Sequence, residues 1–302
     1  MSEDSNKKIS FSLLNIDASG LKEPGLLLIE KVSSAIGAAT YTWTRKWKAN
    51  ADAKAKITLS KADIEISELQ ERSLQRMLAE ECKHQENMES ITQKAIPNLD
   101  ESANPKEIDD DWMANFFNKC RHISNDQMQD LWAKILAGEA NRSGSFSRKT
   151  ISILNDLSQE DALLFRDLCN FSWIVGASYS PIIFDPEETI YKDNGLSFNK
   201  LVNLDNIGLI SLSSSPGYGR WTNSDSFEVG YDEKLYSLTL SKDGKGEYFL
   251  NIGKTLLTQP GEEILKVIET EIVDGFEEYV LNKWKNHTPK AICKISDRFA
   301  RS

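Results

Sequence analysis

Apolar residues recur at helical spacing through the middle of the chain. Within residues 128–136 they fall at positions i, i+3, i+4, i+7 and i+8, which is the pattern of one helix face. Trp112, Phe116 and Cys120 share a helix face in the same way. These segments are short and amphipathic, so the pattern predicts a central helical bundle over residues 112–178.

Three helix starts are predicted within this bundle. Ser124 with Gln127 matches the capping-box pattern, and Ser147 and Ser158 each precede a further apolar stripe. Caps so close together favour several short helices rather than one long one.

The N-terminal part is predicted to be helical over residues 21–96, after a flexible leader at 1–20. Residues 51–86 are rich in Ala, Lys, Glu, Gln and Leu, which favour long helices. Their apolar residues are unevenly spaced, so we expect an exposed helix with a thin apolar seam, not a regular coiled coil. Residues 97–111 combine two prolines with six acidic residues and are predicted to be an acidic linker.

The pattern changes after about residue 175, where alternation predicts short strands at 227–231, 235–240 and 248–252. A helix is predicted to end in the turn Ile207-Gly208-Leu209-Ile210, and another to cover residues 262–276.

This order is typical of winged-helix modules, so a winged-helix-like module is predicted for residues 179–282, followed by a basic tail at 283–302. The predicted fold class is therefore mainly α with a C-terminal α+β part. The winged-helix order also raises a DNA-binding regulator as an alternative, but residues 196–270 carry seven Lys and Arg against ten acidic residues, which is unfavourable for phosphate contact.

Composition limits the class of protein. Apolar residues make up 40% of the chain and charged residues 27%, as in a folded globular protein. The net charge of −10 disfavours general binding to nucleic acid. The four cysteines form no CxxC pair, and neither a signal peptide nor a spanning apolar run is visible, so we expect a cytoplasmic protein.

The strongest candidate contact surface is a basic and aromatic segment near residue 45. Its aromatic and basic residues are Tyr41, Trp43, Arg45, Lys46, Trp47 and Lys48. A helix of this composition can lie on an anionic membrane surface or dock on a partner. The alternative is a helix that packs its aromatic residues on its own core and leaves its lysines in solvent.

No catalytic, cofactor-binding or metal-binding residue is predicted. Gly253-Lys254-Thr255 resembles the end of a phosphate-binding loop. That motif also requires a glycine at position 248, where this chain has Tyr248. The pairs Cys82–His84 and Cys120–His122 have i, i+2 spacing, so their side chains diverge on a helix, although the two pairs could meet in space.

The run "MQDLWAKILAGE" at residues 128–139, "GSFS" at 144–147 and "DALLF" at 161–165 resemble the signature of an uncharacterised bacterial family, a domain of unknown function. The resemblance covers roughly residues 25–280. The run is similar, more weakly, to the abortive-infection alpha group, which is associated with bacterial resistance to phage. The resemblance implies no catalytic residues, only caps and core positions: Trp112, Phe116, Leu131, Trp132, Gly138, Glu139, Gly144, Phe146, Ser147 and Phe165.

Taken together, these observations favour a non-enzymatic interaction or scaffold protein with an unidentified protein partner. The resemblance adds an expected link to phage defence or a stress response. A DNA-binding regulator and a peripheral membrane-docking adaptor remain the alternatives.

Overall fold

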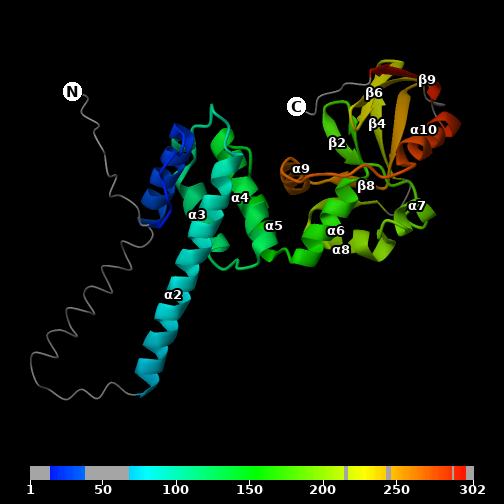
Figure 1. The fold of residues 1–302 in the computed structure, drawn as a ribbon. Coiled ribbons are helices and arrows are strands. Elements are labelled where there is room, and N and C mark those ends of the chain that lie inside the picture. The colour runs from blue at the N-terminus through cyan, green and yellow to red at the C-terminus, as the bar shows by residue number, and fades with distance from the viewer. Residues whose placement is uncertain (1–13, 38–67, 214–216, 243–245, 288, 297–302) are drawn as a thin grey trace, which may run out of the picture. The chain divides into compact units, whose positions relative to one another are not determined.

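The computed structural model describes residues 14–37, 68–213, 217–242, 246–287 and 289–296. Contacts divide the chain into two compact units, Met1–Asn155 and Asp156–Ser302, whose elements are drawn in Figure 1. Each unit has its own buried core. The described residues of the first unit are helical, and the second unit combines helices with sheets. This confirms the predicted helical N-terminal half and sheet-containing C-terminal part. The domain boundaries predicted from the sequence stay predictions.

The first unit is built on α2 (Glu68–Ala95) and α4 (Asp126–Asn141), which pack against each other. Its other elements are a helix over residues 23–37, η1 (Ile96–Asn98), η2 (Pro105–Glu107), α3 (Asp110–Cys120) and α5 (Arg148–Asp156). Large apolar side chains fill the space between them because each helix turns its apolar stripe inward. The fully covered ones include Leu28, Val32, Ile91, Met113, Phe116, Trp132, Ile135, Leu136, Ile151 and Leu154.

Side-chain caps begin α3, α4 and α5, but the cap of α4 lies at a different residue from the predicted one. The Asn125 carboxamide, not Ser124, accepts the N–H of Met128 and starts α4. The Ser124 hydroxyl instead accepts a hydrogen bond from Asn87 on α2. The predicted Ser124–Gln127 capping box is therefore wrong by one residue, because a contact between helices takes the hydroxyl that the pattern assigned to the cap.

The segment predicted as an acidic linker packs on the end of α4. Ala103, Pro105 and Ile108 are buried, and the Asn104 N–H donates to the Ala140 carbonyl at 3.1 Å. Its acidic end has a structural use, since the Asp109 carboxylate accepts the N–H of Trp112 at 2.8 Å and begins α3.

The described residues of the second unit form three sheets, and every strand pairing within them is antiparallel. Five strands have the order β2-β1-β5-β6-β9, while β3 pairs with β8 and β4 pairs with β7. The strands are β1 (Ser172–Val175), β2 (Ser178–Pro181), β3 (Ile210–Leu212), β4 (Tyr218–Thr222), β5 (Ser226–Tyr231), β6 (Lys234–Leu240), β7 (Tyr248–Gly253), β8 (Thr255–Leu257) and β9 (Pro289–Ser296). The helices are α6 (Gln159–Cys169), α7 (Thr189–Lys192), α8 (Phe198–Ile207), α9 (Gln259–Leu265) and α10 (Phe276–His287).

Aromatic rings form the core of this unit. Trp173 stacks on Tyr231 with 5.0 Å between ring centroids and meets Trp284 of α10 edge-on, also at 5.0 Å. The Trp284 indole N–H donates to the Asn251 carbonyl at 2.7 Å, so the ring is buried with its polar atom satisfied. These contacts join α10 to the sheets.

The helix predicted over residues 262–276 is wrong beyond Leu265, where α9 ends. The following segment, up to residue 275, is not helical, and two of its backbone N–H groups bond to side chains from distant parts of the sequence. The Glu271 N–H donates to the Asn170 carboxamide, and the Val273 N–H donates to the Tyr231 hydroxyl. These bonds replace the ones a continued helix would make.

The predicted basic tail also contains regular structure. Residues up to 287 belong to α10, and β9 pairs with β6 in the five-stranded sheet. The predicted strands at 227–231, 235–240 and 248–252 correspond to β5, β6 and β7.

Candidate interaction surfaces

The predicted contact segment, Tyr41, Trp43, Arg45, Lys46, Trp47 and Lys48, lies outside the described residues. Its membrane or partner contact therefore stays a prediction. Among the described helices, none combines the length and hydropathy that crossing a bilayer requires.

The aromatic residues of the family-like signature lie in the core of the first unit. Trp112 stacks on Phe116 with 5.1 Å between centroids, and Phe116 meets Trp132 edge-on at the same distance. All three are buried. Phe165 belongs to the core of the second unit. Leu131 and Gly138 are half-buried on α4.

Glu139 holds the loop that carries the other signature residues. Its buried carboxylate accepts the N–H of Gly144 at 2.6 Å and that of Phe146 at 2.9 Å. The Phe146 carbonyl accepts the indole N–H of Trp112 at 2.7 Å. Gly144 has φ of +82°, a conformation that glycine adopts without strain. The Ser147 hydroxyl then accepts the N–H of Thr150 at the start of α5.

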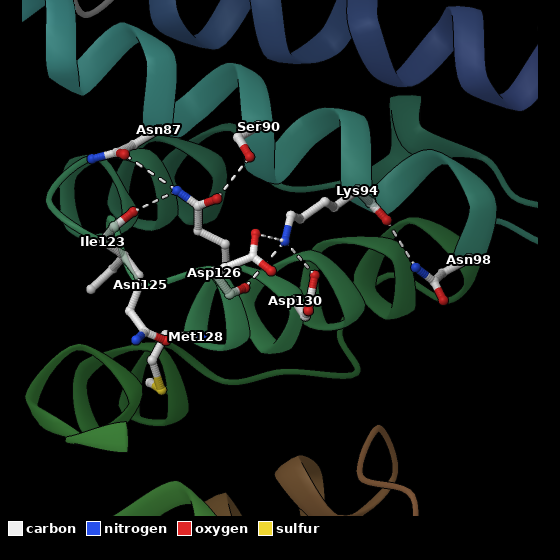
Figure 2. Close-up of polar contacts among 10 residues, drawn as sticks. Asn87, Ser90, Lys94, Asn98, Ile123, Asn125, Asp126, Met128 and Asp130 are labelled. Atoms are coloured by element: carbon white, nitrogen blue, oxygen red, sulfur yellow. Dashed lines mark hydrogen bonds and ion pairs between the residues drawn. The ribbon is translucent and has the colours of Figure 1, made fainter. Parts of the chain in front are cut away.

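A polar layer between α2 and α4 brings together residues that the sequence analysis did not single out (Figure 2). The Gln129 carboxamide donates to Asn87 at 3.2 Å and to the Ile123 carbonyl at 2.9 Å, and accepts from the Ser90 hydroxyl at 2.7 Å. The Asn87 carboxamide donates to the Arg121 carbonyl at 2.8 Å. Because these groups satisfy one another at a packed face, the layer fixes the register of the two helices.

An ion pair continues this layer toward solvent. The Lys94 ammonium lies 2.6 Å from a carboxylate oxygen of both Asp126 and Asp130 (Figure 2). Burial alone lowers the pKa of Lys94, but the two carboxylates outweigh it, so the pKa lies above its ordinary value. The cluster ties α2 to the start of α4.

The first part of α2 is not covered in the same way. None of residues 68–86 is buried, whereas Asn87, Met88, Ile91, Thr92 and Ala95 are. We call residues 68–86 the uncovered part of α2. Leu69 is 65% exposed and Leu78 is 43% exposed.

The apolar seam is present in both parts of α2 but is interrupted between them. Leu74 and Met77 precede Met88, Ile91 and Ala95 at heptad-like spacing on one side of the helix, with Glu81 and His84 at the heptad positions in between. Ion pairs within the helix, Arg72–Glu68 at 3.4 Å and Arg76–Glu80 at 3.6 Å, flank the seam. The uncovered part therefore presents a narrow apolar stripe bordered by charges of both signs.

The two cysteine–histidine pairs meet only through their histidines. The rings of His84 and His122 lie edge-on with centroids 4.5 Å apart, and the Arg121 guanidinium donates to His122 at 3.3 Å. Cys120 is buried, and burial raises its thiol pKa, while Cys82 is exposed. In the part of the chain that the structure describes, no three His, Cys, Asp or Glu side chains are arranged to hold a metal ion.

Gly253-Lys254-Thr255 has a structural explanation. Gly253 has φ of +89°, and a Cβ atom there would lie 2.4 Å from the Ile183 carbonyl oxygen. The Lys254 N–H donates to that oxygen at 2.7 Å, and the buried Thr255 hydroxyl donates to the Pro181 carbonyl at 2.8 Å. This motif joins two segments of backbone.

Sequence reasoning missed a hollow of about 280 Å³ beside the pairing of β4 with β7. We call it the indole hollow, and its lining residues are Trp221, Thr222, Asn223, Lys242, Gly246, Glu247 and Tyr248. The Trp221 side chain is 57% exposed, and the Lys242 ammonium lies 5.5 Å from the centroid of the Tyr248 ring. No strand was predicted where β4 lies, and the signal available in the sequence was Trp221 itself.

A family model described as a protein of unknown function (DUF2806) matches residues 71–281. The match includes α3 to α5, strands β1 to β8 and most of the uncovered part of α2, and it ends before β9. It confirms the expected kinship with a domain of unknown function, while the similarity to the abortive-infection alpha group stays a prediction. No curated protein and no solved structure matches the chain.

Proposed function

The chain belongs to the DUF2806 family of proteins of unknown function, and from that premise we propose that it is a cytoplasmic, non-enzymatic interaction protein that docks a protein partner on α2. The observation that supports this function is the uncovered part of α2, where no residue is buried. A helix of 28 residues is about 42 Å long, and most helical stability comes from packing of an apolar face. A partner that covers the stripe supplies that packing.

The chemistry of the stripe indicates the kind of partner. Leu74, Met77 and Leu78 form a narrow apolar surface, and the bordering residues carry both signs of charge. This surface suits an amphipathic helix with its own charged borders, because apolar anchors and flanking ion pairs then match along the contact.

Site-specific photocrosslinking in cells of the source organism tests the proposal. A photoreactive phenylalanine analogue replaces Leu78, and a matched control places it at Lys149, an exposed residue of α5. We expect a discrete adduct with one protein from position 78 and none from position 149. The adduct should be lost when Leu74 is also changed to Lys. Equal adduct patterns from the two positions, or none from position 78, contradict the proposal.

DNA binding is a second candidate function, favoured by the order of elements around α8. This helix ends at Gly208, with φ of +90°, and leads into β3, which pairs with β8 just before α9. Such an order supports the winged-helix-like module. The exposed residues of α8 include Asn199, Lys200 and Asn203, and asparagine can read adenine in the major groove.

Fluorescence anisotropy with a random duplex measures this activity. A DNA-binding module should show affinity that falls steeply with salt and weakens when Lys200 is changed to Ala. Affinity that is undetectable at low salt excludes this alternative.

Membrane docking remains an alternative that rests on the sequence of residues 41–48. Co-sedimentation with vesicles of phosphatidylserine and phosphatidylcholine should then depend on Trp43, Trp47 and Lys48. A peripheral adaptor should lose sedimentation when these residues are changed together to Ala, and a protein that never sediments with the vesicles excludes the alternative.

A role in phage defence follows only from the predicted similarity to the abortive-infection alpha group. Deletion of the gene should raise the efficiency of plating of at least one phage that infects the source organism. A stress-response role predicts reduced survival of the same deletion strain under the relevant stress. A deletion strain with unchanged phage and stress phenotypes contradicts both.

A further inference from the structure

The five tryptophans that the structure describes differ sharply in exposure. Trp112, Trp132, Trp173 and Trp284 are at most 4% exposed, whereas Trp221 is 57% exposed. An indole offers one of the largest apolar surfaces of any side chain, and covering it is strongly favourable. An exposed tryptophan beside a hollow therefore favours binding of a ligand that covers the ring.

The exposed indole is held in place. Trp221 lies opposite Phe249 in the pairing of β4 with β7, and their ring centroids are 4.7 Å apart. Phe249 reaches across the strand to Gly219, where a Cβ atom would lie 1.7 Å from the phenylalanine ring. The glycine thus makes room for the ring that supports the indole, and the indole face is preorganised for a ligand.

The rest of the indole hollow provides hydrogen-bonding groups of several kinds. Thr222 supplies a hydroxyl and Asn223 a carboxamide, while Lys242 and Glu247 supply one charge of each sign. The Lys242 ammonium lies over the Tyr248 ring, which limits its freedom. The hollow is therefore polar and close to neutral, with an aromatic wall.

From this arrangement we infer that the indole hollow binds a neutral carbohydrate. The C–H face of a sugar ring packs on the electron-rich face of an indole, and its hydroxyl groups bond to amide, hydroxyl and carboxylate groups at the rim. Single-stranded nucleic acid also stacks on tryptophan, but it needs a basic groove for its phosphates. The balanced charge of Lys242 and Glu247 favours the neutral ligand. This site is separate from the proposed docking function of α2.

Isothermal titration calorimetry on the full chain tests the inference with three probes: maltotriose, cellotriose and triacetylchitotriose. An oligothymidylate serves as the nucleic-acid comparison. We expect at least one oligosaccharide to bind. Trp221→Ala should raise the Kd of that complex by about tenfold or more. Trp221→Phe should retain more affinity than Trp221→Ala because it keeps an aromatic face.

The matched control is Phe198→Ala, which removes another exposed aromatic ring, 48% exposed, on α8. It should leave the Kd unchanged. Near-ultraviolet circular dichroism checks that each variant is folded. Asn223→Ala should also lower the affinity for the sugar, and it leaves the pair of Trp221 and Phe249 unaltered. Absence of binding by all three sugars at millimolar concentration, binding unchanged by Trp221→Ala, or binding of the oligothymidylate alone overturns the inference.

Discussion

The two parts of α2 share one apolar face but differ in what covers it. Residues 87–95 pack on α4 and include the buried Met88, Ile91 and Ala95, and the polar layer around Gln129 fixes their register. Residues 68–86 carry Leu74, Met77 and Leu78 without a buried position among them. The same pattern along one helix thus produces a core in one place and a surface in another, because burial depends on the partner that the fold provides.

The largest contrast should come from truncating apolar side chains in the two parts. Ile91 is fully buried, so Ile91→Ala should lower the free energy of unfolding by about 2–5 kcal/mol through lost burial and a cavity. Leu78→Ala, in the uncovered part, should change it by less than about 0.5 kcal/mol. Urea unfolding followed by circular dichroism measures both. Equal losses would show that the two parts are covered alike in solution.

A smaller effect should follow from removing a polar contact. Asn87→Ala deprives the Arg121 carbonyl and the Gln129 carboxamide of a partner, so it should cost about 1–3 kcal/mol. Gln75→Ala is the control on the uncovered part and should cost less than about 0.5 kcal/mol. The same unfolding measurement applies. An Asn87→Ala cost no greater than that of the control would argue against the polar layer as a structural element.

The smallest expected effect is a change of stability with pH at the boundary between the covered and uncovered parts of α2. The pKa of His122 lies below its ordinary value of 6.5, through burial first and then the nearby His84 and Arg121, against the opposing effect of Glu81 and Glu80. The unfolded chain therefore takes up the proton first as pH falls, and folded-state stability decreases below about pH 6.5.

Hydrogen exchange of the backbone amides near residue 84 measures this change between about pH 7.5 and pH 5.5. After correction for the intrinsic pH dependence of exchange, protection should fall at the lower pH in the native protein. It should fall less in His122→Asn, which cannot take up the proton. A matching loss of protection in both proteins would assign the change to other groups.

Much of the secondary structure was accessible from local pattern. The face shared by Trp112 and Phe116 and the cap at Ser158 depend on residues three or four apart, which a helix brings together by itself. The end of α9 was not accessible, because Asn170 and Tyr231 hold the segment after it from far away in the sequence. The indole hollow was missed for a similar reason, since Lys242 and Trp221 meet only through strand pairing.

The sequence by itself determined the helical character of the first unit, the strands β5 to β7 and the kinship with a family of unknown function, because these depend on spacing and residue type within short windows. Tertiary structure alone decided that Glu139 accepts hydrogen bonds from the loop after α4, that the His84 ring contacts the His122 ring, and that Trp221 is exposed to solvent. Each depends on segments far apart in the chain, and the sequence order of two segments does not specify the distance between them in the fold.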